Sequence, residues 1–127
     1  LIISFDIFLD VVDSFGYTPF FYACQYNNLI AAQKLVNLGC NIYHNGGIHD
    51  SLTTALHLAT AYGHLNIVKW LVESGLNINA LNENENTPID ISKFEGFQDI
   101  YHWYISEGIN LHEKRLESTL LHQIVWA

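Results

Sequence analysis

The sequence predicts an all-α solenoid, in which pairs of short helices repeat along one domain and stack on one another. Four threonines mark a period near 33 residues, at spacings of 36, 33 and 32: Thr18, Thr54, Thr87 and Thr119. Glycine or asparagine recurs nine and twenty-one residues after each of the first three threonines. These residues are Asn27, Gly63 and Gly96, and then Gly39, Gly75 and Gly108. Both types adopt positive φ readily, as helix ends require, so their shared period indicates a repeat array.

The first helix of each pair is expected to begin just after the marker threonine. Thr18 and Thr87 are each followed by a proline, Pro19 and Pro88. Threonine is a good N-cap, and proline suits the first helical position because its missing N–H would have no partner there. The sequence therefore predicts three helices of about two turns, each ending at the first of the two glycine or asparagine positions.

A second helix is expected in each pair, over residues 29–38, 65–74 and 97–107. In the middle one an apolar stripe follows the helical period, formed by Leu65, Val68, Leu71 and Val72. Short, turn-rich stretches connect the pairs and predict hairpin-like loops. These observations predict one domain over residues 1–127, with complete repeats over about 13–48, 49–81 and 82–113 and partial repeats over 1–12 and 114–127.

The repeating unit resembles the ankyrin repeat, a β-turn followed by two antiparallel helices with a Thr-Pro-Leu-His-x-Ala signature. Residues 54–80 match this pattern almost position by position, and the resemblance covers nearly the whole chain. It implies a structural role for His57 and His122, because the family's histidine at this position hydrogen-bonds the backbone of a neighbouring loop. It also implies that the chain binds other proteins and needs no cofactor.

Several positions depart from the family pattern. The usual glycine two residues before the threonine is present only as Gly16, so a different turn is expected at its counterparts, Leu52, Glu85 and Glu117. The connection between Gly39 and Thr54 is three residues longer than the next one, which predicts a bulging loop. That loop is either neutral drift or functional. The outward-facing residues of both partial repeats are apolar, so the array is expected to continue in a larger parent protein or to be covered.

Composition limits the classes of protein to which the chain belongs. Half of its 127 residues are hydrophobic and seventeen are aromatic, which excludes intrinsic disorder. Five Lys and Arg against thirteen Asp and Glu give a net charge of −8, which disfavours binding to nucleic acid or to an anionic membrane. No apolar run is long enough to cross a bilayer. With only two cysteines, an intracellular protein of the cytoplasm is expected, or of a host cytoplasm if it is a secreted effector.

No catalytic or metal-binding chemistry is expected. The loop residues Cys40, His44, His49 and Asp50 include metal-ligand types, but their spacing lacks the second ligand pair of a zinc site. Cys24 stands where the family has a small residue packed between helices, so it is expected to be a buried structural thiol. Asn79 lies where some ankyrin repeats are hydroxylated, although an asparagine bonding its own turn is the simpler interpretation.

A protein-binding face is expected on the concave side of the array, where the resemblance places the exposed residues of the first helices. The aromatic and acidic candidates on this side are Tyr22, Tyr26, Tyr62, Phe94 and Glu95, with Gln25, Leu58, Ala61 and Ile91 beside them. Tyr26, Tyr62 and Glu95 hold equivalent positions and should form a row. Two acidic residues at a hairpin tip, Glu83 and Glu85, add negative charge and favour a basic or mixed-charge partner. Alternatively, the tyrosines only stack on their neighbours.

The predicted function is therefore a protein–protein interaction module, with no small-molecule substrate. The alternative is a targeting or regulatory array of a larger enzyme or effector whose catalytic domain lies outside residues 1–127.

Overall fold

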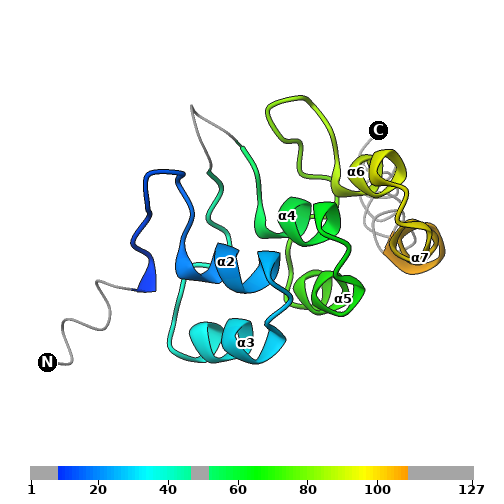
Figure 1. Ribbon diagram of the computed structural model, residues 1–127. Helices are drawn as coiled ribbons and strands as arrows, with labels where there is room; N and C mark the ends of the chain where they lie inside the picture. The colour runs from blue at the N-terminus through cyan, green and yellow to red at the C-terminus, as the bar shows by residue number, and fades with distance from the viewer. Residues whose placement is uncertain (1–8, 47–51, 109–127) are drawn as a thin grey trace, which may run out of the picture.

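The computed structural model is described over residues 9–46 and 52–108, and it consists of stacked helix pairs (Figure 1). Each pair is antiparallel, and the loops that precede α2 and α6 project to the same side. Helices contact one another within each pair, and also between neighbouring pairs through α2 with α4, α4 with α6, and α5 with α7. The elements are α2 (Pro19–Gln25), α3 (Leu29–Asn37), α4 (Ala55–Ala61), α5 (Leu65–Glu73), α6 (Pro88–Glu95), α7 (Gln98–Trp103) and a π-helical turn η1 (Tyr104–Gly108). The predicted all-α repeat architecture is confirmed.

The marker threonines begin the first helix of each pair, as predicted. Thr18, Thr54 and Thr87 have extended backbones, and each side chain accepts a hydrogen bond from the backbone N–H three residues later. In the second and third repeats the side chain at that position returns the bond. His57 Nδ1 lies 3.2 Å from the Thr54 nitrogen, and Asp90 Oδ2 lies 3.1 Å from the Thr87 nitrogen. Two backbone N–H groups that have no partner within the helix thus find one at the start of each of these helices.

The helix ends also lie where the glycine and asparagine spacing predicts them. Asn27, Gly63 and Gly96 have φ values of 59°, 79° and 77° after the first helices. Gly39 and Gly75 have φ values of 97° and 102° after the second helices. Positive φ at these positions lets the chain reverse direction directly after the last helical turn.

The last helix differs from the prediction of a continuous helix over 97–107. The α-helix ends at Trp103, and a π-helical turn continues from Tyr104 to Gly108. Tyr104 occupies the position held by Leu35 and Leu71 in the earlier repeats. The wider turn therefore begins where a tyrosine ring replaces a leucine inside the stack.

The expectation of a different turn at Glu85 is wrong. Glu85 has a φ of 62°, close to the 77° of Gly16, and the two turns share their hydrogen bonds. Asp13 Oδ1 accepts from the N–H groups two and four residues later, at 2.9 and 3.1 Å, and Asn82 Oδ1 does the same at 2.9 and 3.0 Å. The side-chain acceptor five residues before the threonine thus holds the turn, even without glycine. Glu117 lies outside the described residues.

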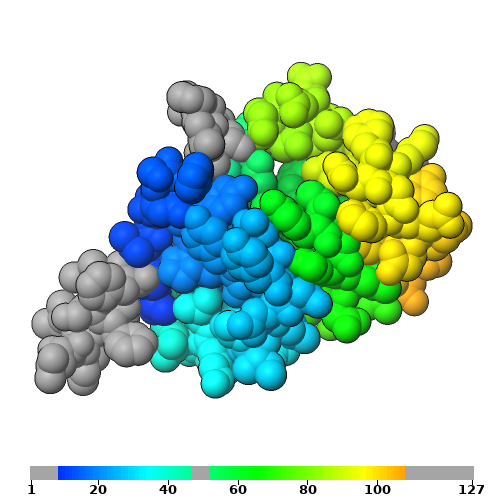
Figure 2. All heavy atoms as spheres, in the orientation of Figure 1, coloured from blue at the N-terminus to red at the C-terminus, as the bar shows by residue number. Residues whose placement is uncertain are grey.

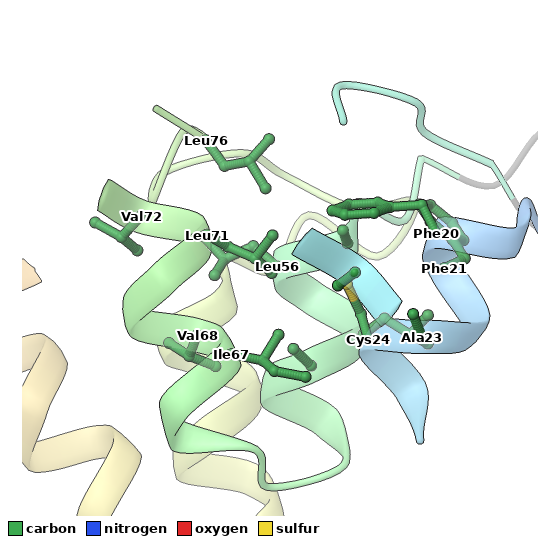
Figure 3. Packing of buried hydrophobic residues seen from close by; sticks show 14 of the residues in the cluster. Phe20, Phe21, Ala23, Cys24, Leu56, Ile67, Val68, Leu71, Val72 and Leu76 are labelled. Carbon is green, nitrogen blue, oxygen red and sulfur yellow. The ribbon is translucent and has the colours of Figure 1, made fainter. Parts of the chain in front are cut away.

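The core of the stack lies between the helix pairs and is apolar (Figure 3). Figure 3 shows aromatic and small side chains of α2 facing the aliphatic side chains of α4 and α5. The labelled members are Phe20, Phe21, Ala23, Cys24, Leu56, Ile67, Val68, Leu71, Val72 and Leu76, all of them buried. This packing holds the helix pairs against one another.

Candidate functional site

The first helices α2, α4 and α6 carry large exposed apolar side chains near their C-terminal ends. Tyr26 and Phe94 are each 70% exposed and Tyr62 is 50% exposed. Glu95, which holds the position equivalent to the two tyrosines, is exposed as well, whereas Tyr22 is half-buried. Figure 2 shows the surfaces of α2, α4 and α6 side by side across one face of the molecule. Exposed aromatic side chains of this size are typical of protein-binding surfaces.

One residue expected on this face lies in the core instead. Leu58 is only 5% exposed, while its equivalents Tyr22 and Ile91 are half-buried. The reason is its place in the array: α4 is the central first helix and is packed between α2 and α6. A neighbour on each side covers a leucine at this position.

The tyrosines of α2 contact both one another and an acidic loop residue. The rings of Tyr22 and Tyr26 are nearly parallel, with centroids 6.2 Å apart and an angle of 9° between their planes. The Tyr17 ring lies 5.4 Å from that of Tyr22. The Tyr22 hydroxyl donates a hydrogen bond to Asp13 Oδ2, which raises the pKa of Tyr22 to about 12 and lowers the pKa of Asp13. Asp13 is therefore ionised at neutral pH.

Tyr62 joins the first repeat to the second. Its hydroxyl accepts a hydrogen bond of 3.2 Å from Gln25 Nε2, and its ring lies 6.4 Å from the nearly parallel ring of His64. His64 Nε2 is in turn 2.6 Å from the backbone oxygen of Gln25. Stacking and exposure thus occur together, so the two sequence-based interpretations of the tyrosines do not exclude each other.

A hollow of about 270 Å³, here called the tyrosine hollow, opens beside α2. Its lining residues are mainly aromatic: Phe15, Tyr17, Tyr22, Gln25 and Tyr26. Sequence reasoning did not single out Phe15, Tyr17 or Asp13. The signal that could have identified Asp13 is its recurrence as Asn82, five residues before a marker threonine.

Two acidic side chains lie at the hairpin tip that precedes α6. Glu83 and Glu85 are exposed, and Glu83 Oε2 accepts a hydrogen bond of 3.3 Å from the backbone N–H of Leu52. The pKa of Tyr17 is raised, chiefly by partial burial and further by electrostatic effects of Tyr62, Asp13 and Glu83, in that order. The tip of the third repeat therefore contributes negative potential at the tyrosine hollow of the first.

A second, larger hollow of about 470 Å³ lies between α2 and α3. Pro19, Ala23, Ala31 and Leu35 form part of its lining. The equivalent residues of the second repeat are completely buried against the first repeat: Ala55, Ala59, Ile67 and Leu71. The larger hollow is thus the surface of the first repeat that corresponds to the surface by which the second repeat packs on the first.

His57 has the contacts that the resemblance implies. Its Nε2 lies 2.9 Å from the backbone oxygen of Asn86 in the next loop, while Nδ1 faces the N–H of Thr54. Burial lowers the pKa of His57 below its ordinary value. The neutral ring, with its proton on Nε2, satisfies both partners. Thr119 and His122 lie outside the described residues.

The residues with potential metal or nucleophilic chemistry are engaged in structural contacts. Burial raises the pKa of the Cys24 thiol to about 12 and, with the charge of Asp10, that of Cys40 to about 11. Both thiols are therefore protonated at neutral pH and poorly nucleophilic. His44 Nε2 lies 3.0 Å from the Gly16 oxygen. Among residues 9–46 and 52–108 no three metal-ligand types cluster, and His49 and Asp50 lie outside these ranges.

Asn79 has a backbone role in the turn after α5. Its N–H donates a hydrogen bond of 3.0 Å to Asn77 Oδ1. The side chain that bonds this turn is thus that of Asn77. The sequence-based interpretation, in which the Asn79 side chain bonds its own turn, names the wrong asparagine for this hydrogen bond.

Within the described part of the chain, no helix combines the length and the apolarity of a bilayer-spanning segment.

Comparison with known proteins agrees with this architecture. A family model described as ankyrin repeats (3 copies) matches residues 1–82 and 43–115. XBAT35 of Arabidopsis thaliana, named as a candidate E3 ubiquitin-protein ligase, is 34% identical over 94 residues, covering 72% of this chain and 20% of that protein. VAPYRIN-LIKE of Medicago truncatula is 32% identical over 101 residues, covering 77% and 20%.

A shorter relative has a higher sequence identity to the chain, over fewer residues. Protein phosphatase 1 regulatory subunit 27 of Mus musculus is 41% identical over 61 residues, covering 48% of this chain and 40% of that protein. The chain spans about a fifth of the length of the first two relatives. The chain belongs to the ankyrin repeat family.

Proposed function

We propose that the face formed by α2, α4, α6 and the preceding hairpin tips binds a protein partner with a basic or mixed-charge surface. The observation that carries this proposal is the row of exposed aromatic side chains, Tyr26, Tyr62 and Phe94, on helices held by a rigid core. Aromatic anchors on a preorganised scaffold bind with little loss of conformational entropy. The family generally binds proteins, which agrees with this assignment.

Charge supports a basic or mixed partner. The exposed acids near the aromatic row are Glu83, Glu85 and Glu95, and the chain as a whole has a net charge of −8. Complementary potentials raise association rates and reject partners of the same sign. Nucleic acid and anionic lipid are therefore poor partners. Neither a cofactor nor a small-molecule substrate is part of the proposal, and the repeats themselves are proposed to be non-catalytic.

The alternative is that the repeats target or regulate an enzyme or effector of which they form one part. It is favoured by the small share of the relatives that the chain covers, and by the name of XBAT35, which describes a ubiquitin ligase. Both versions place the protein inside the cell, in the cytoplasm of its own cell or of a host. The two half-buried or buried free cysteines fit a reducing compartment.

The test is a binding comparison between wild-type protein and the Tyr26→Ala/Tyr62→Ala variant. Partners captured from lysate are identified, purified and titrated against both proteins, with melting temperatures measured in parallel. Loss of a buried interface tyrosine costs about 2 kcal/mol or more, so the variant is expected to bind at least roughly 30-fold more weakly. Tyr43→Ala is the matched control, because Tyr43 is also an exposed tyrosine but lies beside Gly75, at the end of α5.

Two results would contradict the proposal. One is unchanged affinity of the double variant for every partner. The other is a loss of affinity explained entirely by unfolding, which would make Tyr26 and Tyr62 stacking residues only.

A further inference from the structure

The tyrosine hollow has the chemistry of a site for a flat cation. Its walls are the rings of Phe15, Tyr17, Tyr22 and Tyr26, and the last two are nearly parallel. The face of an aromatic ring carries negative electrostatic potential and attracts a cation within about 6 Å of its centroid. Wherever such a ring presents its face to the hollow, it favours a positively charged group over a neutral apolar one.

The hollow also contains a hydrogen-bond acceptor that lacks a donor. Gln25 lines the hollow, and its Nε2 donates to the Tyr62 hydroxyl. Its Oε1 is shielded from solvent and has no hydrogen-bond partner among the described residues. A shielded acceptor without a donor costs free energy until a ligand supplies one. An occupant with N–H groups removes this penalty if the Gln25 side chain turns so that Oε1 faces the hollow.

Negative charge beside the tyrosine hollow adds to its preference for a cation. The Asp13 carboxylate is held beside the hollow by the Tyr22 hydroxyl, and the charges of Asp13 and Glu83 both act on Tyr17. Of the two common cationic side chains, arginine fits better. Its guanidinium is planar, stacks on aromatic rings, is weakly hydrated and presents five donors, whereas the lysine ammonium is compact and strongly hydrated.

We propose that the tyrosine hollow receives an arginine side chain of the protein partner, stacked on Tyr22 or Tyr26 beside the Asp13 carboxylate, and that it donates to Gln25 Oε1 once the Gln25 side chain turns toward it. This inference rests on the proposed function, because the hollow adjoins the exposed row of that face. It makes the first repeat the specificity-determining one. The second and third repeats have Thr53 and Asn86 at the position of Tyr17, so they lack an equivalent wall.

The test uses a short peptide with one arginine, acetyl-Gly-Gly-Arg-Gly-Gly-amide, and two matched peptides in which lysine or citrulline replaces arginine. Citrulline keeps the planar shape of arginine and three of its five N–H donors, but a carbonyl oxygen replaces one NH₂ group and the charge is lost. Each peptide is titrated into ¹⁵N-labelled protein, and amide shifts are recorded. Arginine is expected to shift residues 13–26 and Tyr62, and to bind at least about threefold more tightly than citrulline, as one exposed cation–π contact predicts. Lysine is expected to fall between them.

Two variants locate the site. Tyr26→Leu keeps an apolar side chain but removes the ring, and should weaken arginine binding about threefold or more. Gln25→Glu adds a carboxylate at the shielded acceptor, and should tighten it severalfold because a charged acceptor forms a stronger hydrogen bond. A gain of affinity cannot result from unfolding. Tyr43→Leu, at an exposed aromatic residue outside both the hollow and the aromatic row, should leave binding unchanged.

The outcomes separate this inference from the proposed function. Equal binding of arginine and citrulline, shifts outside the hollow, or an unaffected Tyr26→Leu variant would overturn the arginine site. If the peptides fail while the Tyr26→Ala/Tyr62→Ala variant still loses its partner, the binding face stands without an arginine pocket. If arginine binds as expected but that variant keeps every partner, the hollow is a cation site and the proposed face is wrong.

Discussion

Glu85 shows how a side chain outside the core determines a local conformation. Its φ of 62° is unusual for a residue with a Cβ, and it is maintained by the hydrogen bonds that Asn82 accepts across the turn. A left-handed residue other than glycine costs roughly 1–2 kcal/mol, while glycine loses more backbone entropy on folding. Glu85 thus retains some strain that glycine would relieve.

Replacing Glu85 by glycine is therefore expected to stabilise the fold by about 0.5 kcal/mol, the difference between these two terms. Urea unfolding of wild type and Glu85→Gly measures the change. Asn27→Gly is the control: its φ of 59° is similar, but asparagine tolerates this region, so no gain is expected. Equal effects at both positions would show that strain at Glu85 is not the cause.

His57 makes stability depend on pH. Its pKa is lowered in the folded state, so between that value and 6.5 the unfolded chain binds a proton that the folded chain does not. The free energy of unfolding is therefore fully retained above pH 6.5 and falls as the pH drops below it, by up to about 1.4 kcal/mol per pH unit. Denaturant titrations from pH 7.5 to 5 check this. His57→Gln should be less stable at pH 7.5 and show a flatter profile, and parallel profiles would contradict this origin.

At the scale of the helices, the first turn after α4 depends on close packing as well as on backbone conformation. A Cβ built on Gly63 would lie 2.8 Å from Cε1 of the Phe97 ring, at the start of α7. Gly96 has nearly the same φ, 77° against 79°, but open space around it. A comparison of the two glycines therefore separates the free-energy cost of backbone strain from the cost of the close contact with Phe97.

Alanine at either glycine is expected to destabilise the protein by about 1 kcal/mol through backbone strain. Gly63→Ala should cost a further 1–3 kcal/mol, roughly, because the Phe97 ring must move. Thermal or urea unfolding of both variants gives the comparison. If the two losses are equal, the approach of Phe97 to the glycine is not what this turn requires.

The helix boundaries could be predicted from sequence because caps are local. Thr18, Thr87 and the glycines after each helix act through atoms within a few residues. Three features could not be predicted in this way. The burial of Leu58 depends on helices on either side, and the Gln25–Tyr62 bond joins residues 37 apart. The π-helical turn begins at Tyr104, whose hydroxyl contacts Thr60 of another repeat. The tyrosine hollow could not be predicted for the same reason, since Phe15 and Tyr17 of the loop before α2 supply part of its wall.

At the scale of the whole molecule, repeats are joined by specific polar contacts as well as by the core. The Thr60 hydroxyl in α4 lies 2.9 Å from the Tyr104 hydroxyl in η1, and both residues are buried. This hydrogen bond connects the second repeat to the third. A buried hydroxyl that loses its partner costs about 1–3 kcal/mol, more than the net value of the bond.

Tyr104→Phe and Thr60→Val are each expected to lower the free energy of unfolding by about 1–3 kcal/mol. The double variant should lose less than the sum, by roughly 0.5–1.5 kcal/mol, because neither hydroxyl is left unpaired. Urea unfolding of the four proteins completes the cycle. Strict additivity would show that the two hydroxyls do not contribute as a pair.

The succession of contacts from one helix pair to the next also determines how the molecule responds to tension. A globular domain shares load through one core, but in a linear stack the junctions carry the same force in series. The weakest junction separates first and relieves the load on the others. Each repeat released adds a length of chain set by the 33 residues between Thr54 and Thr87, roughly 110 Å when extended. Under tension, the array is therefore expected to unfold one repeat at a time and to refold onto the repeats that stay folded.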